Sequence, residues 1–563
     1  MDNLRLILVF ALIVTSFLLW QAWQKDYGPS SVTATASGSK TEQTTASTEA
    51  TAPKVSADTS VTNISVAADN SAKSSSETPN AETTKEFAGR AIKVETDLFK
   101  LEIDSKGGTV KDMFLMDYPK TLKNPDVKFQ LMKGTPPGLF IAQSGLIGMD
   151  KEAAPTHESE YSVASDSFKM APGKDSLSVD LDWSSPSGIT VTKRFIFTRG
   201  SYQIKVQHIV KNSSGQPWTG REYDQLQRSP DAKNGNGGFA RAYTGAAIYT
   251  PENKYEKITF DDMKESKLNL KTKGGWVAML QHYFLGAWVP NPDEENHFYT
   301  DIHSGDHYTV GTYTPSITIP NDGEYTFNSS LVAGPKLQNQ LRKIAPGLEL
   351  TVDYGWLTIV AQPIFWLMGK LHSILGNWGW SIIILTLLIK LAFYKLSETS
   401  YKSMANMRKM TPRMKALKER YGDDKQRLNQ AMMDLYKKEK INPLGGCLPI
   451  VVQIPVFIAL YWVLLESVEL RQAPFMFWIH DLSTKDPYYV LPVIMGVSMF
   501  IQQKLNPTPP DPMQAKIMMA LPFVFTVMFA TFPAGLVLYW VVNNILSISQ
   551  QWYITRQIEK AAK

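Results

Sequence analysis

The chain has 563 residues, which is long enough for more than one domain. Its hydrophobic content of 44% resembles that of a soluble protein, but this average combines a polar first two thirds with an apolar last third and so hides a membrane protein. The single cysteine, Cys447, excludes an intramolecular disulfide framework and a cysteine-rich zinc site. The formal net charge of +5 is small for this length and says little about partners.

The chain begins with an apolar run, Leu6 to Trp20. A secretory signal would place a small-x-small cleavage site directly after such a run, whereas Ala34 to Ala36 is the nearest such pattern and lies far downstream. Residues 1–24 are therefore predicted to be an uncleaved transmembrane anchor helix with an aromatic belt. Residues 25–86 are rich in Ser, Thr and Ala and cannot bury enough apolar surface to fold, which predicts a flexible tether.

Residues 87–350 change to a period of two. Leu177, Val179 and Leu181 alternate with polar residues, and glycine-containing turn signals separate the apolar runs. Two of these signals are Lys106-Gly107-Gly108 and Asn321-Asp322-Gly323. The pattern predicts a large antiparallel β-sandwich domain.

His303, Asp306 and His307 lie close enough in this segment to be metal ligands. Histidines and acids in a loop beside a glycine are more often plain surface residues, so we expect no metal and no other cofactor. The chain also carries no nucleophile motif, glycine-rich phosphate loop or zinc pattern, and we expect that it is not an enzyme.

Basic residues set the predicted orientation of the last third. Between Tyr401 and Lys440, twelve basic residues stand against five acidic ones, which places this segment in the cytoplasm. If the amino terminus is also inside, two crossings fit, the anchor and Trp380 to Tyr394. Residues 351–376 are then predicted to be an amphipathic helix in the outer interface, and the β-sandwich lies outside the cytoplasm.

Three further segments complete the predicted membrane core. Cys447 to Leu465 and Tyr488 to Ile501 are apolar spans. A single helix from Lys516 to Arg556 would be about 60 Å long, twice the thickness of the hydrocarbon core. It is therefore predicted to be a hairpin, broken at Phe532-Pro533-Ala534-Gly535. The fold class is an α-helical polytopic membrane protein, with an anchor helix and a five-helix core in residues 377–563, joined to the β-sandwich.

Residues 398–441 are predicted to form a cytoplasmic hairpin of two amphipathic helices. Most such helix pairs only pack against each other, but here the methionines give a soft surface of the kind that accepts varied apolar partners. The residues of this predicted capture surface are Met404, Met407, Met410, Met414, Met432 and Met433.

Lys390 lies inside the predicted crossing Trp380 to Tyr394. A cation at membrane depth is costly, which makes it a candidate functional site. The lysine also lies about 7 Å along the helix from the polar edge at Lys395, so its ammonium could extend to the headgroups instead. The residue alone leaves both interpretations open.

Five strings in the last third of the chain are specific enough to indicate a family. They are NPLGGCLP at 442–449, QIP at 453–455, ELRQAPF at 469–475, WIHDL at 478–482 and FPAGLVLY at 532–539. These strings resemble the YidC family of bacterial membrane protein insertases, and the resemblance covers the whole chain in the family's order, from anchor to five-helix core.

The resemblance implies a hydrophilic groove that is open to cytoplasm and lipid, is sealed toward the periplasm, and carries an arginine that attracts the polar tail of a substrate. Lys390 stands at the matching position, which keeps the charge but loses the bidentate fork of arginine. The implied substrate-groove residues are Lys390, Thr386, Gln453 and Trp540. The implied slide into lipid is formed by Ile454, Pro455, Phe529 and Phe532.

By the same resemblance, we expect an insertase and chaperone of nascent inner-membrane proteins that works alone or with the Sec translocon. The expected partners are ribosome–nascent chain complexes and the bilayer, without recognition of nucleic acid sequence. We expect a multi-pass protein of the bacterial inner membrane with both termini cytoplasmic and the large domain periplasmic. A secondary transporter would usually show internal repeats, which are absent from the sequence. A sugar enzyme is the other alternative, since large β-sandwiches resemble carbohydrate-active folds, but fold analogy gives no activity.

Overall fold

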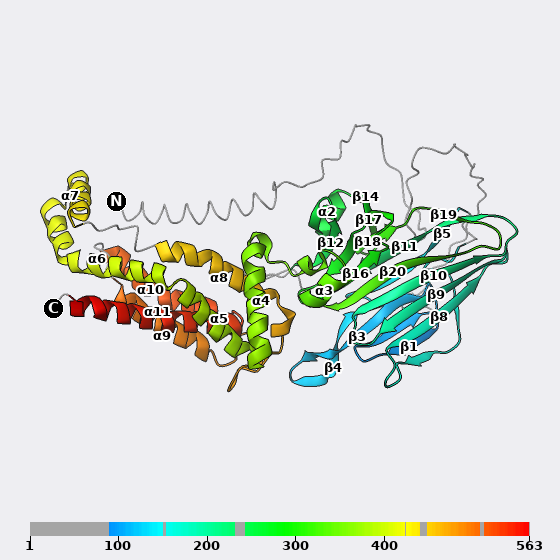
Figure 1. Cartoon of the computed structure of the whole chain (residues 1–563), viewed down its shortest axis with the longest axis horizontal. Coiled ribbons are helices and arrows are strands. Elements are labelled where there is room, and N and C mark those ends of the chain that lie inside the picture. Colours follow the sequence, from blue (N-terminus) through cyan, green and yellow to red (C-terminus); the bar gives the residue numbers. More distant parts are fainter. Residues whose placement is uncertain are drawn as a thin grey trace, which may run out of the picture. The chain divides into compact units, whose positions relative to one another are not determined.

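The computed structural model describes residues 89–149, 154–230, 243–422, 424–439, 448–506 and 512–561. The predicted anchor and tether lie outside these residues. The described residues up to Thr351 form one compact unit, and those from Val352 form another (Figure 1).

The first unit is a β-sandwich of two large sheets, with two short helices and a 3-10 turn, α2 (Phe260–Glu265), α3 (Gln338–Ile344) and η2 (Leu348–Thr351). Among the described residues, an eleven-stranded sheet contains β1 (Ala91–Glu95), β2 (Phe99–Asp104), β3 (Thr109–Thr121), β4 (Asn124–Met132), β5 (Phe140–Gly148), β7 (Ser167–Lys169), β11 (Trp218–Arg228), β14 (Asn269–Lys273), β17 (Glu295–His303), β18 (His307–Tyr313) and β19 (Ile317–Ile319). The nine strands described in the other sheet are β6 (Ser162–Val163), β8 (Ser176–Ser184), β9 (Ile189–Thr198), β10 (Gln203–Asn212), β12 (Gly245–Thr250), β13 (Lys254–Ile258), β15 (Trp276–Leu280), β16 (Phe284–Pro290) and β20 (Glu324–Pro335).

The predicted β-sandwich is confirmed, and the alternation of the sequence explains it. In β8, Val179 and Leu181 are buried, while Ser178 and Asp182 on either side of them are exposed. The predicted turn at Gly107 and Gly108 also forms, between β2 and β3. Both glycines have positive φ angles there, of 74° and 59°, a conformation that glycine adopts without steric cost.

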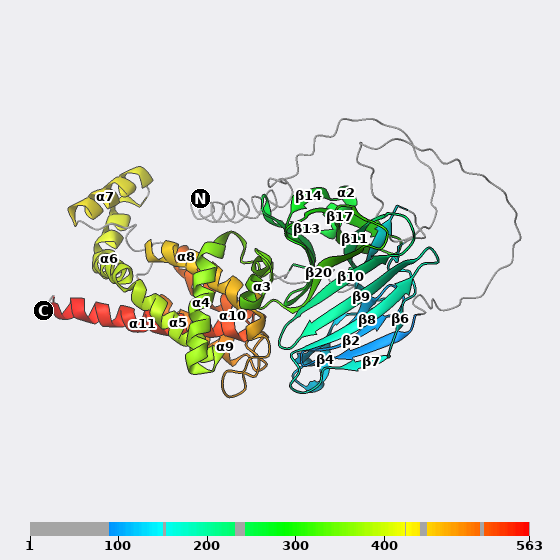
Figure 2. The ribbon, with the colours of Figure 1, turned by 45° about the vertical axis from the view of Figure 1, so that its right-hand side comes forward.

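The second unit is helical. Its elements are η3 (Gly355–Leu357), α4 (Thr358–Leu375), α5 (Trp378–Ala392), α6 (Tyr394–Tyr421), α7 (Lys425–Lys438), α8 (Leu448–Glu466), η5 (Val468–Leu470), α9 (Val490–Leu505), α10 (Pro512–Phe529) and α11 (Ala534–Ala561). The left-handed Gly376 ends α4, and the Asn377 side chain then caps α5 by accepting from the backbone N–H of Trp380. The long α11 packs against α5, α6 and α9 (Figure 2).

Helix length and composition decide which of these helices could cross a bilayer alone. In the described part of the chain, no individual helix combines the length and the apolar character needed to cross a bilayer. The consecutive helices α5 and α6, which are bent by 67° at their junction, meet both requirements only when they are taken together.

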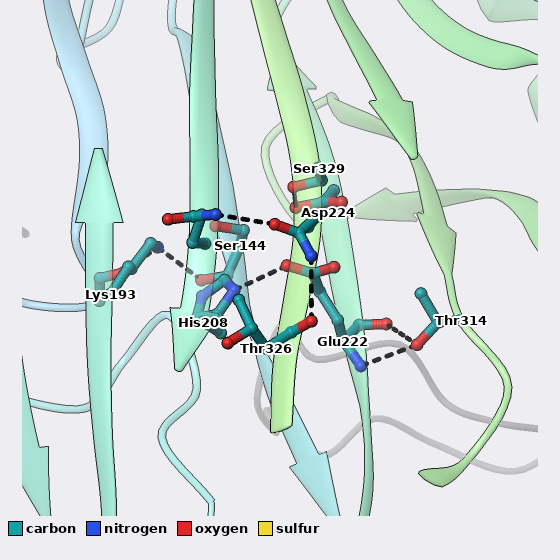
Figure 3. A network of polar contacts seen from close by, with 11 residues as sticks. Ser144, Lys193, His208, Glu222, Asp224, Thr314, Thr326 and Ser329 are labelled. Atoms are coloured by element: carbon teal, nitrogen blue, oxygen red, sulfur yellow. Dashed lines mark hydrogen bonds and ion pairs between the residues drawn. The ribbon is translucent and has the colours of Figure 1, made fainter. Parts of the chain in front are cut away.

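A network of buried charged groups joins the inner faces of the two sheets of the sandwich (Figure 3). Lys193 of β9 donates to the backbone carbonyls of Gly107 and Ser144, at 2.8 and 2.9 Å. The Nδ1 atom of His208 in β10 lies 2.7 Å from a carboxyl oxygen of Glu222 in β11. Because water cannot reach these groups, their hydrogen bonds must come from one another and from the backbone.

Burial determines the charge states in this network. It lowers the pKa of Lys193 to about 7 and raises the pKa of Asp224 to about 7. It also lowers the pKa of His208 well below its ordinary value and raises that of Glu222 well above its own. His208 and Glu222 are therefore held as a neutral hydrogen-bonded pair, which avoids the cost of two desolvated charges.

We predict that the substitution His208→Gln changes how the stability of the sandwich depends on pH. A histidine in the unfolded chain protonates below about pH 6.5, whereas the folded pKa of His208 is much lower. Because the pKa of His208 is lower in the folded than in the unfolded protein, its contribution to the free energy of unfolding is complete above about pH 6.5. This contribution is lost as the pH falls, at up to about 1.4 kcal/mol per pH unit. Only the wild type has this loss, so its stability advantage over the variant should narrow below pH 6.5.

Hydrogen exchange of the backbone amides of β9, β10 and β11, measured in the full chain between pH 5 and 7.5, gives the free energy of opening of the wild type and of the variant. An advantage that stays constant over this range would contradict the neutral burial of His208.

Candidate functional site

A cavity of about 340 Å³ lies among α5, α6, α8, α9, α10 and α11. Among the described residues that line it, Lys390 is the one charged side chain, and no carboxylate is present. Its apolar wall includes Phe457, Leu521 and Phe525. A cation thus stands in a largely apolar enclosure without a counter-ion at its wall.

Polar side chains line the cavity from α6, α8, α9 and α11, and those of α11 include the ones nearest Lys390. Asn543, Asn544 and Ser547 are buried on one stripe of this helix and line the cavity. Gln453 of α8 donates from Nε2 to Oδ1 of Asn543 at 2.7 Å, and Nδ2 of Asn544 donates to the hydroxyl of Ser498 in α9 at 3.1 Å. These bonds satisfy amides that would otherwise be costly to bury, and they join α8 and α9 to α11.

Lys390 extends toward this polar stripe. Its Nζ atom donates to Oγ of Ser547 at 2.7 Å. Within the described part of the chain, no carboxylate lies within 4.0 Å of the ammonium. The lysine therefore reaches across to α11, and its charge is left without an opposite charge.

The structure places three of the four predicted groove residues at the cavity, namely Lys390, Gln453 and Trp540. Thr386 does not line it, because this residue is buried one turn before the lysine and its hydroxyl donates to the carbonyl of Ile382 at 2.6 Å. The indole N–H of Trp540 is buried and has no hydrogen-bond partner among the described residues. A donor of this kind can bind a carbonyl of a chain that enters.

The predicted slide residues lie on α8 and around the end of α10. Ile454 lines the cavity with 49% of its surface exposed, and Pro455 follows it within α8. Phe529 is buried, with its ring 4.9 Å from that of Phe532 and 5.6 Å from that of Trp540. The aromatic cluster forms an apolar continuation of the cavity wall.

Backbone hydrogen bonds join the start of α11, where it follows α10, to the loop between α8 and α9. The N–H groups of Ala534 and Gly535 donate to the carbonyls of Thr484 and Leu482, at 2.7 and 2.9 Å. The carboxylate of Asp486 in the same loop accepts from the indole of Trp478 at 3.0 Å. The break in the predicted hairpin at residues 532–535 is thus fixed to this loop.

The six methionines of the predicted capture surface differ in their exposure. Met410 and Met414 are buried, and the hydroxyl of Tyr436 in α7 contacts the sulfur of Met414 at 3.9 Å. Met433 is 54% exposed, and Met404 lines the cavity. The remaining two of the six, Met407 and Met432, are half-buried.

Sequence reasoning missed the residues of α11 that surround the lysine. Asn543, Ser547 and Gln551 recur every four residues in the middle of α11. That spacing places them on one face, and it is a signal that could have identified the polar stripe. Tyr401 of α6, which also lines the cavity, has no comparable signal.

Comparisons with known proteins indicate the same family for both units of the chain. Residues 91–367 match the family model of the YidC periplasmic domain, and residues 370–561 match that of the 60Kd inner membrane protein. The protein of Methylococcus capsulatus named membrane protein insertase YidC is 51% identical over 562 residues, covering 100% of this chain and 99% of the relative. The protein of the same name from Stutzerimonas stutzeri is 50% identical over 565 residues and is covered completely, as is this chain.

A solved structure described as an active YidC insertase with its first transmembrane domain resolved is 17% identical, with a TM-score of 0.37. The match covers 83% of this chain and 93% of that chain. The matches of the two family models and the full-length identity of about 50% establish the family. This chain belongs to the YidC family.

Proposed function

We propose that this protein inserts nascent membrane proteins into the bacterial inner membrane, with the cavity around Lys390 receiving the polar flank of the incoming segment. Relatives that are about 50% identical over the full chain are named membrane protein insertases. The observation that carries the mechanism is a cation without a counter-ion among the described residues, in a cavity lined by both polar and apolar side chains.

The lysine supplies attraction for a polar or acidic flank. Two unit charges 4 Å apart attract by about 4 kcal/mol at an effective dielectric constant of 20, and by only about 1 kcal/mol in water. The amides of Gln453 and Asn543 offer hydrogen bonds to the same flank, which lowers its desolvation cost.

The apolar part of the substrate leaves toward lipid along α8 and α10. Exposed apolar side chains of α10, including Phe523, Val524 and Val527, continue the surface beyond Ile454. Burial in lipid gains about 25 cal/mol per Å² of apolar surface, so the transfer is downhill and needs no nucleotide. The membrane potential assists an acidic flank by about 2.3 kcal/mol per charge per 100 mV.

The proposal includes a polytopic topology with both termini and the hairpin of α6 and α7 in the cytoplasm. The 15 residues of α5 extend about 22 Å, less than the hydrocarbon core of about 30 Å, so we infer local thinning of the bilayer around the core. The β-sandwich lies in the periplasm and α4 in the outer interface. Ribosome–nascent chain complexes and the Sec translocon are the partners that fit this orientation.

Labelling tests the topology. A single cysteine introduced at Arg420, in a variant lacking Cys447, should be protected from a membrane-impermeant reagent in intact cells. A cysteine at Trp183 should react once the outer membrane is permeabilised. Both positions lie at least partly at the protein surface, so a difference between them reports the side of the membrane. Labelling of the Arg420 position from outside would overturn the topology.

Substitutions of Lys390 test the mechanism. Lys390→Arg should retain activity because the charge is kept. Lys390→Ala should slow insertion of a substrate with an acidic translocated tail about tenfold more than that of a matched neutral substrate, a ratio that corresponds to about 1.4 kcal/mol. Lys390→Glu should be the most damaging because it reverses the sign of the charge. The measurement is the insertion rate of two single-span substrates that differ only in tail charge.

Lys395→Ala is the matched control, since this lysine lies in the first turn of α6 and its side chain is 91% exposed. It should leave the ratio of the two rates unchanged. If Lys390→Ala were equally harmless for both substrates, the lysine would only reach the headgroups and the proposed role of the cavity would be wrong.

A further inference from the structure

The hydroxyl of Ser547 links α11 to α5. It donates to the backbone carbonyl of Asn543 at 2.7 Å, which uses its only proton. Its oxygen accepts from Nζ of Lys390 on α5 at 2.7 Å, and Tyr401 on α6 lines the same cavity. A serine hydroxyl offers one proton and two lone pairs, so its role as acceptor for the ammonium is compatible with its bond to Asn543.

This arrangement selects one conformation of a flexible side chain. Lysine loses about 2 kcal/mol of rotamer entropy when it is fixed, and an unheld lysine near the end of a helix would extend to the headgroups. Ser547 is only 2% exposed and lies on a helix that packs against both α5 and α6, so its oxygen is a fixed point. A fixed acceptor across the cavity directs the ammonium inward.

We infer that Ser547 is a positioning residue for Lys390, holding the ammonium at the cavity through a neutral acceptor that leaves the positive charge available to the substrate. The ammonium has three donors, and Ser547 occupies one of them. A carboxylate at position 547 would hold the lysine equally well but would neutralise it and compete with an acidic tail. This inference rests on the proposed function. It adds that Ser547 helps to determine the preference of the protein for substrates with acidic tails.

Ser549 offers a matched control on the same helix. Its hydroxyl donates to the carbonyl four residues earlier, that of Ile545, at 2.9 Å, just as Ser547 does to Asn543. Ser549 is exposed and lines a separate apolar hollow with residues of α9 such as Val493 and Val497. Replacing either serine by alanine therefore removes the same kind of backbone contact, but only one substitution removes the partner of Lys390.

The experiment measures, in proteoliposomes containing the full chain, the insertion rate of the acidic-tail substrate divided by that of the neutral one. The ratio cancels any loss that affects both substrates. Ser547→Ala should lower the ratio about three- to tenfold, and Ser549→Ala should leave it unchanged. Ser547→Thr, which keeps the hydroxyl, should restore the ratio, and Ser547→Asp should lower it at least as far as alanine does.

A double-mutant cycle distinguishes positioning from a general structural role. In a Lys390→Met background, Ser547→Ala should cause no further change in the ratio. An equal reduction in both backgrounds, or equal ratios for Ser547→Ala and Ser549→Ala, would overturn the positioning role while leaving the proposed function intact. If Lys390→Met itself leaves the ratio unchanged, the proposed function fails, and the inference fails with it.

Discussion

A half-buried positive charge, Lys390, without a counter-ion among the described residues is the constraint on which the helical unit depends. An ammonium in an apolar enclosure is unfavourable unless polar groups surround it. On the polar stripe of α11, the hydroxyl of Ser547 accepts from Lys390, and the neighbouring amides of Asn543 and Asn544 hydrogen-bond to α8 and α9. One face of α11 therefore both receives the ammonium and joins the helices around the cavity.

The two units of the chain treat buried charge in opposite ways. In the sandwich, carbonyl oxygens and nearby acids surround Lys193, and His208 is paired with Glu222 so that little net charge remains. That arrangement suits a rigid core, since its charged groups are paired from within. In the helical unit, the hydrogen bond described for Lys390 goes to the neutral oxygen of Ser547. Under the proposed function, the residual attraction is available to a substrate, which would distinguish this lysine from the structural Lys193.

The sequence predicts the two units because each depends on periodicity. Alternation in β8 and the proline–glycine break before α11 are local signals that the structure reproduces. Lys193 falls on an inward position between Val191 and Phe195, but alternation alone does not show which acids it meets across the sandwich. Likewise, family strings point to Lys390 and Gln453, whereas the contact with Ser547 depends on the rotation of α11 about its axis. Helix rotation is decided by tertiary packing and has no local signature.

The backbone hydrogen bonds that Ala534 and Gly535 donate to the carbonyls of Thr484 and Leu482 have a mechanical consequence. They fix the start of α11 to the loop between α8 and α9, and sliding of α11 along this loop would break both contacts at once. Under the function that we propose, a widening of the cavity would therefore be smallest at this end of α11 and largest toward its other end.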